Sequence, residues 1–150
     1  MNLKNKRIVF LGDSITEGWG TTDESKIFHQ LIKKEYELEL ACNCGIGGTR
    51  IAKQTTPSYL TPRYDLYFAL RASVMPKDVD YVVVFGGTND YGHGDALMGE
   101  IDSLDLYTFN GAFNNLVKQL KNDYPNKKII FLTPLHRVNE DQPNNMGYVF

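Results

Sequence analysis

The sequence predicts an α/β domain built around a mostly parallel sheet. Short apolar runs rich in β-branched and aromatic residues alternate with segments whose apolar residues recur at helical spacing. Glycine-rich or polar segments follow the ends of the apolar runs. With 150 residues, of which 42% are hydrophobic and 23% charged, the chain is sized for one such domain with its own core.

Four strands are expected, at residues 7–11, 38–42, 81–85 and 128–133. The first, third and fourth are continuous apolar runs, which favours burial on both faces of the sheet. The second alternates apolar and polar residues, as a more peripheral strand would.

Helical spacing predicts two crossover helices, at residues 24–37 and 108–123. A third helix is expected over residues 64–72, opened by Thr61 and Pro62, because proline is tolerated in the first turn of a helix. Ligands of open parallel sheets bind outside the carboxyl ends of the strands. The loops at that edge are therefore where a site is expected.

Four polar or glycine-rich segments fall at this edge. Ser14 follows the first strand, 45–48 the second, Asn89 the third and His136 the fourth. Four separate loops that meet at one edge are a stronger indication of a site than any one of these segments alone.

Three of these segments together resemble the GDSL or SGNH hydrolases, a family of serine esterases and lipases. They are Gly12-Asp13-Ser14, Gly45-Ile46-Gly47-Gly48 and Gly86-Gly87-Thr88-Asn89-Asp90. The resemblance runs from about Lys6 to Arg137. It implies a three-layer α/β/α sandwich of the flavodoxin-like SGNH-hydrolase type. The Asp-x-x-His segment that carries the family's catalytic histidine is not found, so we expect one domain truncated to about four strands, without the last strand, the catalytic loop and the closing helix.

The resemblance also implies a role for each site residue. Ser14 would attack a carboxylic ester and form an acyl-enzyme, while its own N–H, the Gly48 N–H and the Asn89 side chain would form the oxyanion hole. Asp13 and Asp90 would support the turns beside them. The expected substrate is a small ester, such as a short-chain acyl ester, a lysophospholipid or an acetylated sugar, and the mechanism needs no cofactor.

Three histidines are candidates for the missing base, and none lies in an Asp-x-x-His context. His29 falls in the middle of an expected helix and is interpreted as a surface or interface residue. His93 lies in a glycine-rich loop and is expected to line the cleft. His136 lies at the correct sheet edge and is a candidate substitute base, although the family places its base on a later loop.

Other interpretations of the same residues remain open. Ser14 and Glu17 spell a Ser-x-x-Glu capping box, which starts a helix whether or not the hydroxyl reacts. The glycine segments also suit plain turns. The fold could instead be a binding module for small acylated or glycosylated ligands, with Trp19, Tyr59 and Tyr91 as aromatic faces. No group of residues shows the close ligand spacing of a metal site.

The composition of the chain limits the kinds of partner that we expect it to bind. The net charge of −2 and the absence of a basic cluster argue against nucleic acid, and no apolar run is long enough to span a membrane. Cys42 and Cys44 are spaced too tightly for easy bridging and nothing implies export, so a reducing cytoplasm is expected. In a truncated domain, the fourth strand would be an exposed edge through which copies self-associate.

Overall fold

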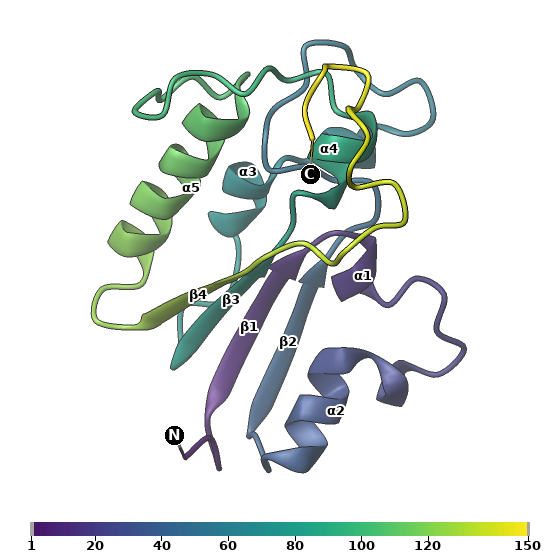
Figure 1. The fold of residues 1–150 in the computed structure, drawn as a ribbon. Helices are drawn as coiled ribbons and strands as arrows, with labels where there is room; N and C mark the ends of the chain where they lie inside the picture. Colours follow the sequence, from purple (N-terminus) through teal and green to yellow (C-terminus); the bar gives the residue numbers. More distant parts are fainter. Residues whose placement is uncertain (1, 150) are drawn as a thin grey trace.

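The computed structural model describes residues 2–149, and its centre is a sheet of four parallel strands (Figure 1). The strand order is β2-β1-β3-β4. The strands are β1 (Arg7–Gly12), β2 (Leu40–Gly45), β3 (Tyr81–Phe85) and β4 (Lys128–Leu132). The expected parallel α/β fold is therefore confirmed.

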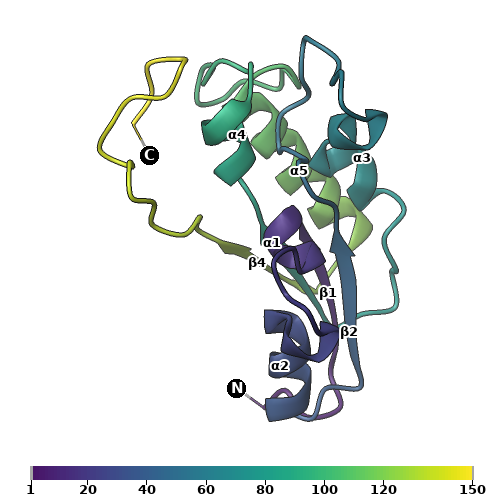
Figure 2. The same cartoon turned by 90° about the vertical axis from the view of Figure 1, so that its right-hand side faces the viewer.

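Helices cover both faces of this sheet, which gives three layers (Figure 2). Helix α2 lies on one face, and α3 and α5 lie on the other. Two short helices, α1 and α4, follow β1 and β3 directly. The helices are α1 (Ser14–Glu17), α2 (Phe28–Glu35), α3 (Phe68–Ala72), α4 (Thr88–His93) and α5 (Phe109–Asp123), with 3-10 turns η1 (Glu24–Lys26) and η2 (Pro62–Asp65).

The two-residue period of β1 divides the core into two parts. Val9 and Leu11 point to the α3 and α5 side, where they join a cluster with Leu116. Ile8 and Phe10 point to the opposite side, towards α2. Because both faces of the central strands are buried, the C-terminal ends of β1 and β3 are held rigidly beneath the loops that follow them.

Several element boundaries differ from the expectation. The predicted helix at 24–37 is two elements, because Ile27 adopts an extended conformation between η1 and α2. Glu37 has a φ of +51°, and β2 begins only at Leu40. The third predicted helix is likewise divided into η2, capped by Thr61, and α3.

Strand β4 is the one strand whose predicted burial is wrong. Only Ile129 and Phe131 pack against the core, while Ile130 and Leu132 on the other face are 37% and 39% exposed. On the side of the sheet that Ile130 and Leu132 face, the core cluster extends from α2 as far as β3, and within residues 2–149 it includes no residue of β4. Self-association through the β4 edge stays a prediction.

The segment after β4 leaves the sheet and returns to α4 (Figures 1 and 2). Arg137 donates to the Thr88 carbonyl, and Asn144 donates to the Tyr91 carbonyl. Within the described residues, no helix combines the length and apolarity needed to cross a membrane.

Candidate active site

The expected site residues come together at the C-terminal ends of three neighbouring strands. Ser14 opens α1 after β1, Gly48 lies in the loop after β2, and Asn89 lies in the first turn of α4 after β3. All three line one cleft with a volume of about 730 Å³. The parallel sheet is what brings these positions together, since they are far apart in the sequence.

Asp13 shapes the turn that presents Ser14. Its carboxylate accepts a hydrogen bond of 3.0 Å from the Ile15 N–H and caps helix α1, and burial raises the pKa of Asp13. The proposed Ser14–Glu17 capping box is therefore not formed, because Asp13 takes the cap position and Ser14 is the first helical residue. Asp13 is only 1% exposed, so it supports the turn from below the cleft.

Gly48 occupies a backbone conformation that requires glycine. Its φ is +75°, and a Cβ atom there would lie 2.5 Å from the Tyr64 ring. The preceding N–H, of Gly47, donates to the Glu17 carboxylate at 2.7 Å, and Arg63 forms an ion pair with the same carboxylate. Glu17 thus joins the helix that begins at Ser14 to the loop that contains Gly48.

Asn89 is oriented by a backbone carbonyl. Its Nδ2 donates to the Thr49 carbonyl oxygen at 2.9 Å, and the side chain is 9% exposed. A primary amide carries two N–H donors. Among residues 2–149, Thr49 accepts only one of them, which leaves the second for a group bound in the cleft.

Asp90, next to Asn89, is buried and points away from the cleft. It accepts hydrogen bonds from the Ile51 N–H at 3.0 Å and the Ala52 N–H at 2.9 Å. Burial raises the pKa of Asp90 to about 6, against the opposing effect of these donors and of Arg50. The carboxyl fastens α4 to the backbone just after Gly48 and Thr49.

Of the three histidines, only His93 lines the cleft, as expected. Its Nδ1 accepts a hydrogen bond of 2.8 Å from Arg50, and burial lowers its pKa. His136 lies outside the cleft: its side chain is 97% exposed and its Nδ1 contacts Glu140 at 2.9 Å. The structure therefore does not bring His136 to Ser14.

His29 is not the surface or interface residue that the sequence suggested, because it is buried in the core. It is 1% exposed, and its Nε2 lies 3.1 Å from the Thr16 carbonyl oxygen in α1. The ring packs against Phe10 and Phe28. Its place on the inner side of α2 explains the error, because the helix begins at Phe28 and turns this residue towards the core.

Two of the three expected aromatic faces lie at the cleft. Trp19 and Tyr59 line it and are strongly exposed. Tyr91 does not line it. Instead, its hydroxyl donates to the Gln142 carbonyl at 2.7 Å and its ring lies under Arg137.

Sequence reasoning missed three charged residues of this region. Arg71 lies beneath the loops, Glu17 binds the Gly47 N–H, and Arg50 contacts His93. For Arg71, the sequence held one indication of a buried role: it is the only charged residue in the otherwise apolar segment Phe68–Ala72. Glu17 was noticed only as part of a capping box, because the loop it binds is 30 residues away.

Comparison with known proteins supports the assignment of the fold and the family. The chain is 31% identical to a protein from Lactobacillus plantarum, with a TM-score of 0.80 over 97% of this chain and 67% of that one. It is 26% identical to a candidate GDSL-like lipase from Bacteroides ovatus, with a TM-score of 0.67 over 88% of this chain and 73% of that one. It is 27% identical to an acetyl xylan esterase, with a TM-score of 0.52 over 85% of this chain and 58% of that one.

Among curated protein sequences, none matches the chain. The model of the GDSL-like lipase/acylhydrolase family, however, matches residues 10–147, which include Ser14, Gly48 and Asn89. With nearly the full chain covered by that match and with the same fold in the solved structures, the protein belongs to the GDSL-like lipase/acylhydrolase family.

Proposed function

We propose that the cleft hydrolyses carboxylic esters through an acyl-enzyme formed on Ser14. The observation that carries the proposal is the meeting of Ser14, Gly48 and Asn89 in one cleft of a chain that belongs to an acylhydrolase family. Similarity to an acetyl xylan esterase adds support for ester chemistry.

Each residue has a defined part in the proposed reaction. The Ser14 hydroxyl oxygen attacks the ester carbonyl carbon, its proton passes to a base, and the carbonyl electron pair moves onto the oxygen. The N–H groups of Ser14 and Gly48 and the second N–H of Asn89 stabilise that oxyanion. Collapse of the intermediate expels the alcohol, which takes up the proton, and water then releases the acid by the same two steps.

We propose that the general base is supplied from outside this chain. Both ring nitrogens of His29 have partners beneath α1, and His136 lies outside the cleft. Arginine can only donate hydrogen bonds, so the Nδ1 of His93 accepts from Arg50 and a neutral His93 carries its proton on Nε2. In that form His93 is a hydrogen-bond donor to a bound molecule and not a base.

The proposed substrates are esters with a small acyl group, within the range of short-chain esters, lysophospholipids and acetylated sugars. The cleft carries charged groups at Arg50, Arg63 and Asp95, which suit a polar alcohol portion. Trp19 and Tyr59 offer exposed aromatic faces on which a sugar ring can pack. These two side chains also favour the second candidate function, a binding module for acylated or glycosylated ligands that carries out no reaction.

A reducing compartment such as the cytoplasm fits the proposal. Cys42 and Cys44 are free thiols whose sulfur atoms lie 3.9 Å apart. Burial raises the pKa of Cys44 to about 12, so this thiol is not activated at neutral pH.

Covalent labelling of Ser14 separates the esterase from the binding module. The protein is treated with a small fluorophosphonate, with imidazole added as an external base, and the modified residue is identified by mass spectrometry. We expect one adduct on Ser14, formed faster as imidazole increases, and none in Ser14→Ala. The matched control is Ser58→Ala, because Ser58 is the other serine that lines the cleft. Equal labelling of wild type and Ser14→Ala would overturn the esterase proposal.

A further inference from the structure

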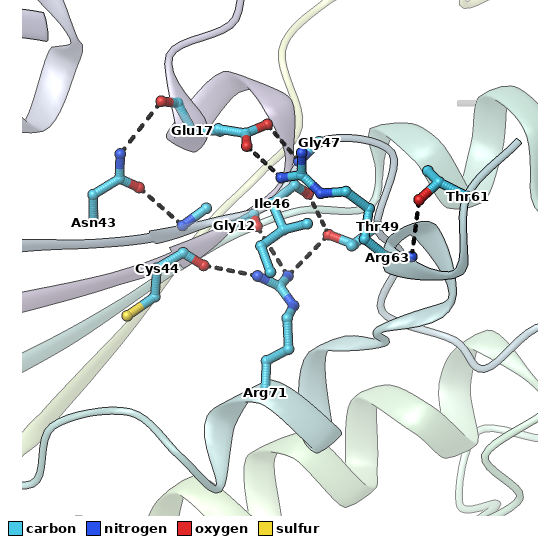
Figure 3. A network of polar contacts seen from close by, with 11 residues as sticks. Gly12, Glu17, Asn43, Cys44, Ile46, Gly47, Thr49, Thr61, Arg63 and Arg71 are labelled. Carbon is cyan, nitrogen blue, oxygen red and sulfur yellow. Dashed lines mark hydrogen bonds and ion pairs between the residues drawn. The ribbon is translucent and has the colours of Figure 1, made fainter.

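Arg71 makes an unusual set of contacts beneath the cleft (Figure 3). Its Nε donates to the Leu66 carbonyl at 3.0 Å, and its Nη1 donates to the Cys44 carbonyl at 2.7 Å. Its Nη2 donates to the Gly12 carbonyl and to the Thr49 hydroxyl, each at 2.9 Å. The guanidinium therefore binds four neutral oxygens that belong to four different parts of the chain.

These contacts come at an energetic cost. Arg71 is 6% exposed, and its four hydrogen-bond acceptors are all neutral. Burial lowers the pKa of Arg71, and the charges of Asp13 and Glu17 offset this only in part. Burial of a charge that is not directly hydrogen-bonded to a carboxylate is unfavourable by several kcal/mol unless many hydrogen bonds compensate. An apolar side chain would avoid the cost of burying a charge but would remove the donor from the oxygens that Arg71 binds, so the positions of those oxygens matter.

Three of these oxygens lie close in sequence to the expected site residues. Gly12 is the last residue of β1 and stands two positions before Ser14, and Cys44 precedes the loop that contains Gly48. Thr49 follows Gly48 directly. One side chain thus fixes the distance between the end of β1, the end of β2 and the loop that carries an expected oxyanion donor.

The contact with Thr49 also connects Arg71 to Asn89, which follows β3. The Thr49 hydroxyl donates its only hydrogen to the Ile46 carbonyl at 2.6 Å, so it must accept from Arg71. The carbonyl of Thr49 in turn accepts from Asn89 at 2.9 Å. Arg71 therefore determines where Thr49 lies, and Thr49 determines which way the Asn89 amide points.

A contact with the Phe68 ring connects Arg71 to the end of β3 as well. The guanidinium carbon lies 4.8 Å from the centre of the Phe68 ring. That ring is packed against Gly86 at the end of β3, where a Cβ atom would lie 2.4 Å from it. Arg71 is thereby connected to the ends of β1, β2 and β3, the three strands that carry the site.

We infer that Arg71 is the positioning residue that holds Ser14, through Gly12, in register with the Gly48 N–H and the Asn89 amide, through Thr49. The inference rests on the proposed function, because it assigns these three groups to one oxyanion. Arg71 does not line the cleft, so it acts on the reaction only through the residues it holds.

The Thr49 hydroxyl offers the sharpest test, because it can be removed with little change in shape. Thr49→Val replaces the hydroxyl with a methyl group, and Thr49→Ser keeps it. We measure the second-order rate constant for fluorophosphonate labelling of Ser14 with imidazole present. We expect Thr49→Val to be slower by about tenfold or more, and Thr49→Ser to stay within about twofold of wild type.

Arg71→Lys and Lys77→Met complete the set. A lysine keeps the charge, but its three N–H donors on one atom cannot reach the four oxygens that the Arg71 guanidinium binds, so we expect Arg71→Lys to be slowed as Thr49→Val is. Lys77 is a matched control because, like Arg71, it donates to a backbone carbonyl (Ala72) and lies over an aromatic ring (Tyr124). Lys77, however, lies at the opposite end of the sheet from the cleft. Lys77→Met is expected to label at the wild-type rate, and thermal melting confirms that each variant is folded.

A second measurement separates positioning from a purely structural role. The side-chain amide resonances of Asn89 in a proton–nitrogen NMR spectrum are expected to shift in Thr49→Val and Arg71→Lys but not in Thr49→Ser or Lys77→Met. Folded variants that keep both the wild-type labelling rate and the Asn89 resonances would overturn the inference. If wild type itself is not labelled on Ser14, the proposed function fails, while the Asn89 resonances still decide whether Arg71 positions that amide.

Discussion

Arg71 and Arg63 hold the same glycine loop by opposite physical means (Figure 3). Arg71 is buried and binds only neutral oxygens, including the Thr49 hydroxyl. The Arg63 side chain is 49% exposed and binds the Glu17 carboxylate, which accepts from the Gly47 N–H. Water and salt compete with an exposed ion pair, whereas the hydrogen bonds of the buried Arg71 side chain are shielded from both. The buried contacts of Arg71 therefore contribute more to the stability of this loop than the exposed ion pair of Arg63 does.

The largest expected effect follows from the buried arginine. Arg71→Met removes the Arg71 donor from the carbonyls of Cys44 and Leu66, and an unsatisfied oxygen costs about 1–3 kcal/mol. The Gly12 carbonyl still accepts from the Ile46 N–H. We expect the free energy of unfolding to fall by about 2 kcal/mol or more, as measured by urea denaturation. If the loss were no greater than that of Arg63→Met, the contrast between the two arginines would be wrong.

The exposed arginine gives a smaller effect that depends on salt. We expect Arg63→Met to lower the free energy of unfolding by less than about 1 kcal/mol, because exposed ion pairs contribute little. The difference from wild type should shrink as sodium chloride is added, since salt screens exposed charges. Glu17→Gln is the companion variant, because the amide oxygen still accepts from Gly47 while the ion pair is lost. If the difference in the free energy of unfolding did not change with salt, the Arg63–Glu17 pair would not behave as an exposed ion pair, and the prediction would be wrong.

His29 contacts the Thr16 carbonyl and so supports helix α1, and its contribution to stability depends on pH. Burial lowers the pKa of His29 below the ordinary 6.5, so the unfolded chain binds more protons between these two values. Stability contributed by neutral His29 is therefore present above that range and is lost as the pH falls through it. We expect the melting temperature of wild type to drop more steeply than that of His29→Gln between about pH 7.5 and about pH 5.5. Parallel slopes would contradict this assignment.

The fold was predictable where one segment decides its own structure. The continuous apolar runs at β1 and β3 identified the two central strands, and Thr108 correctly marks the start of α5. Burial of β4 was not predictable in the same way, because it depends on what lies beside the strand and not on its own residues. The break at Ile27 was hidden for a similar reason, since apolar spacing continues through it.

The site was predictable only in part. Glycine and polar residues after each strand placed Ser14, Gly48 and Asn89, since the topology alone brings such loops together. The positions of His29 and Arg71 were not predictable, because polar residues in helices usually face water. Their buried partners lie 13 and up to 59 residues away, so no local pattern reveals them.

The hydrogen bond from Asn89 to the Thr49 carbonyl bears on how the protein ages. Deamidation of Asn89 would replace one nitrogen with oxygen and change the molecule by a single charge. The new carboxylate would face the Thr49 carbonyl oxygen, where two acceptors repel each other, and the donor offered to the cleft would be gone. A chain altered at this one atom would keep its sheet and its cleft but lose the donor that we propose for the oxyanion, so an old preparation would lose the proposed activity before it lost structure.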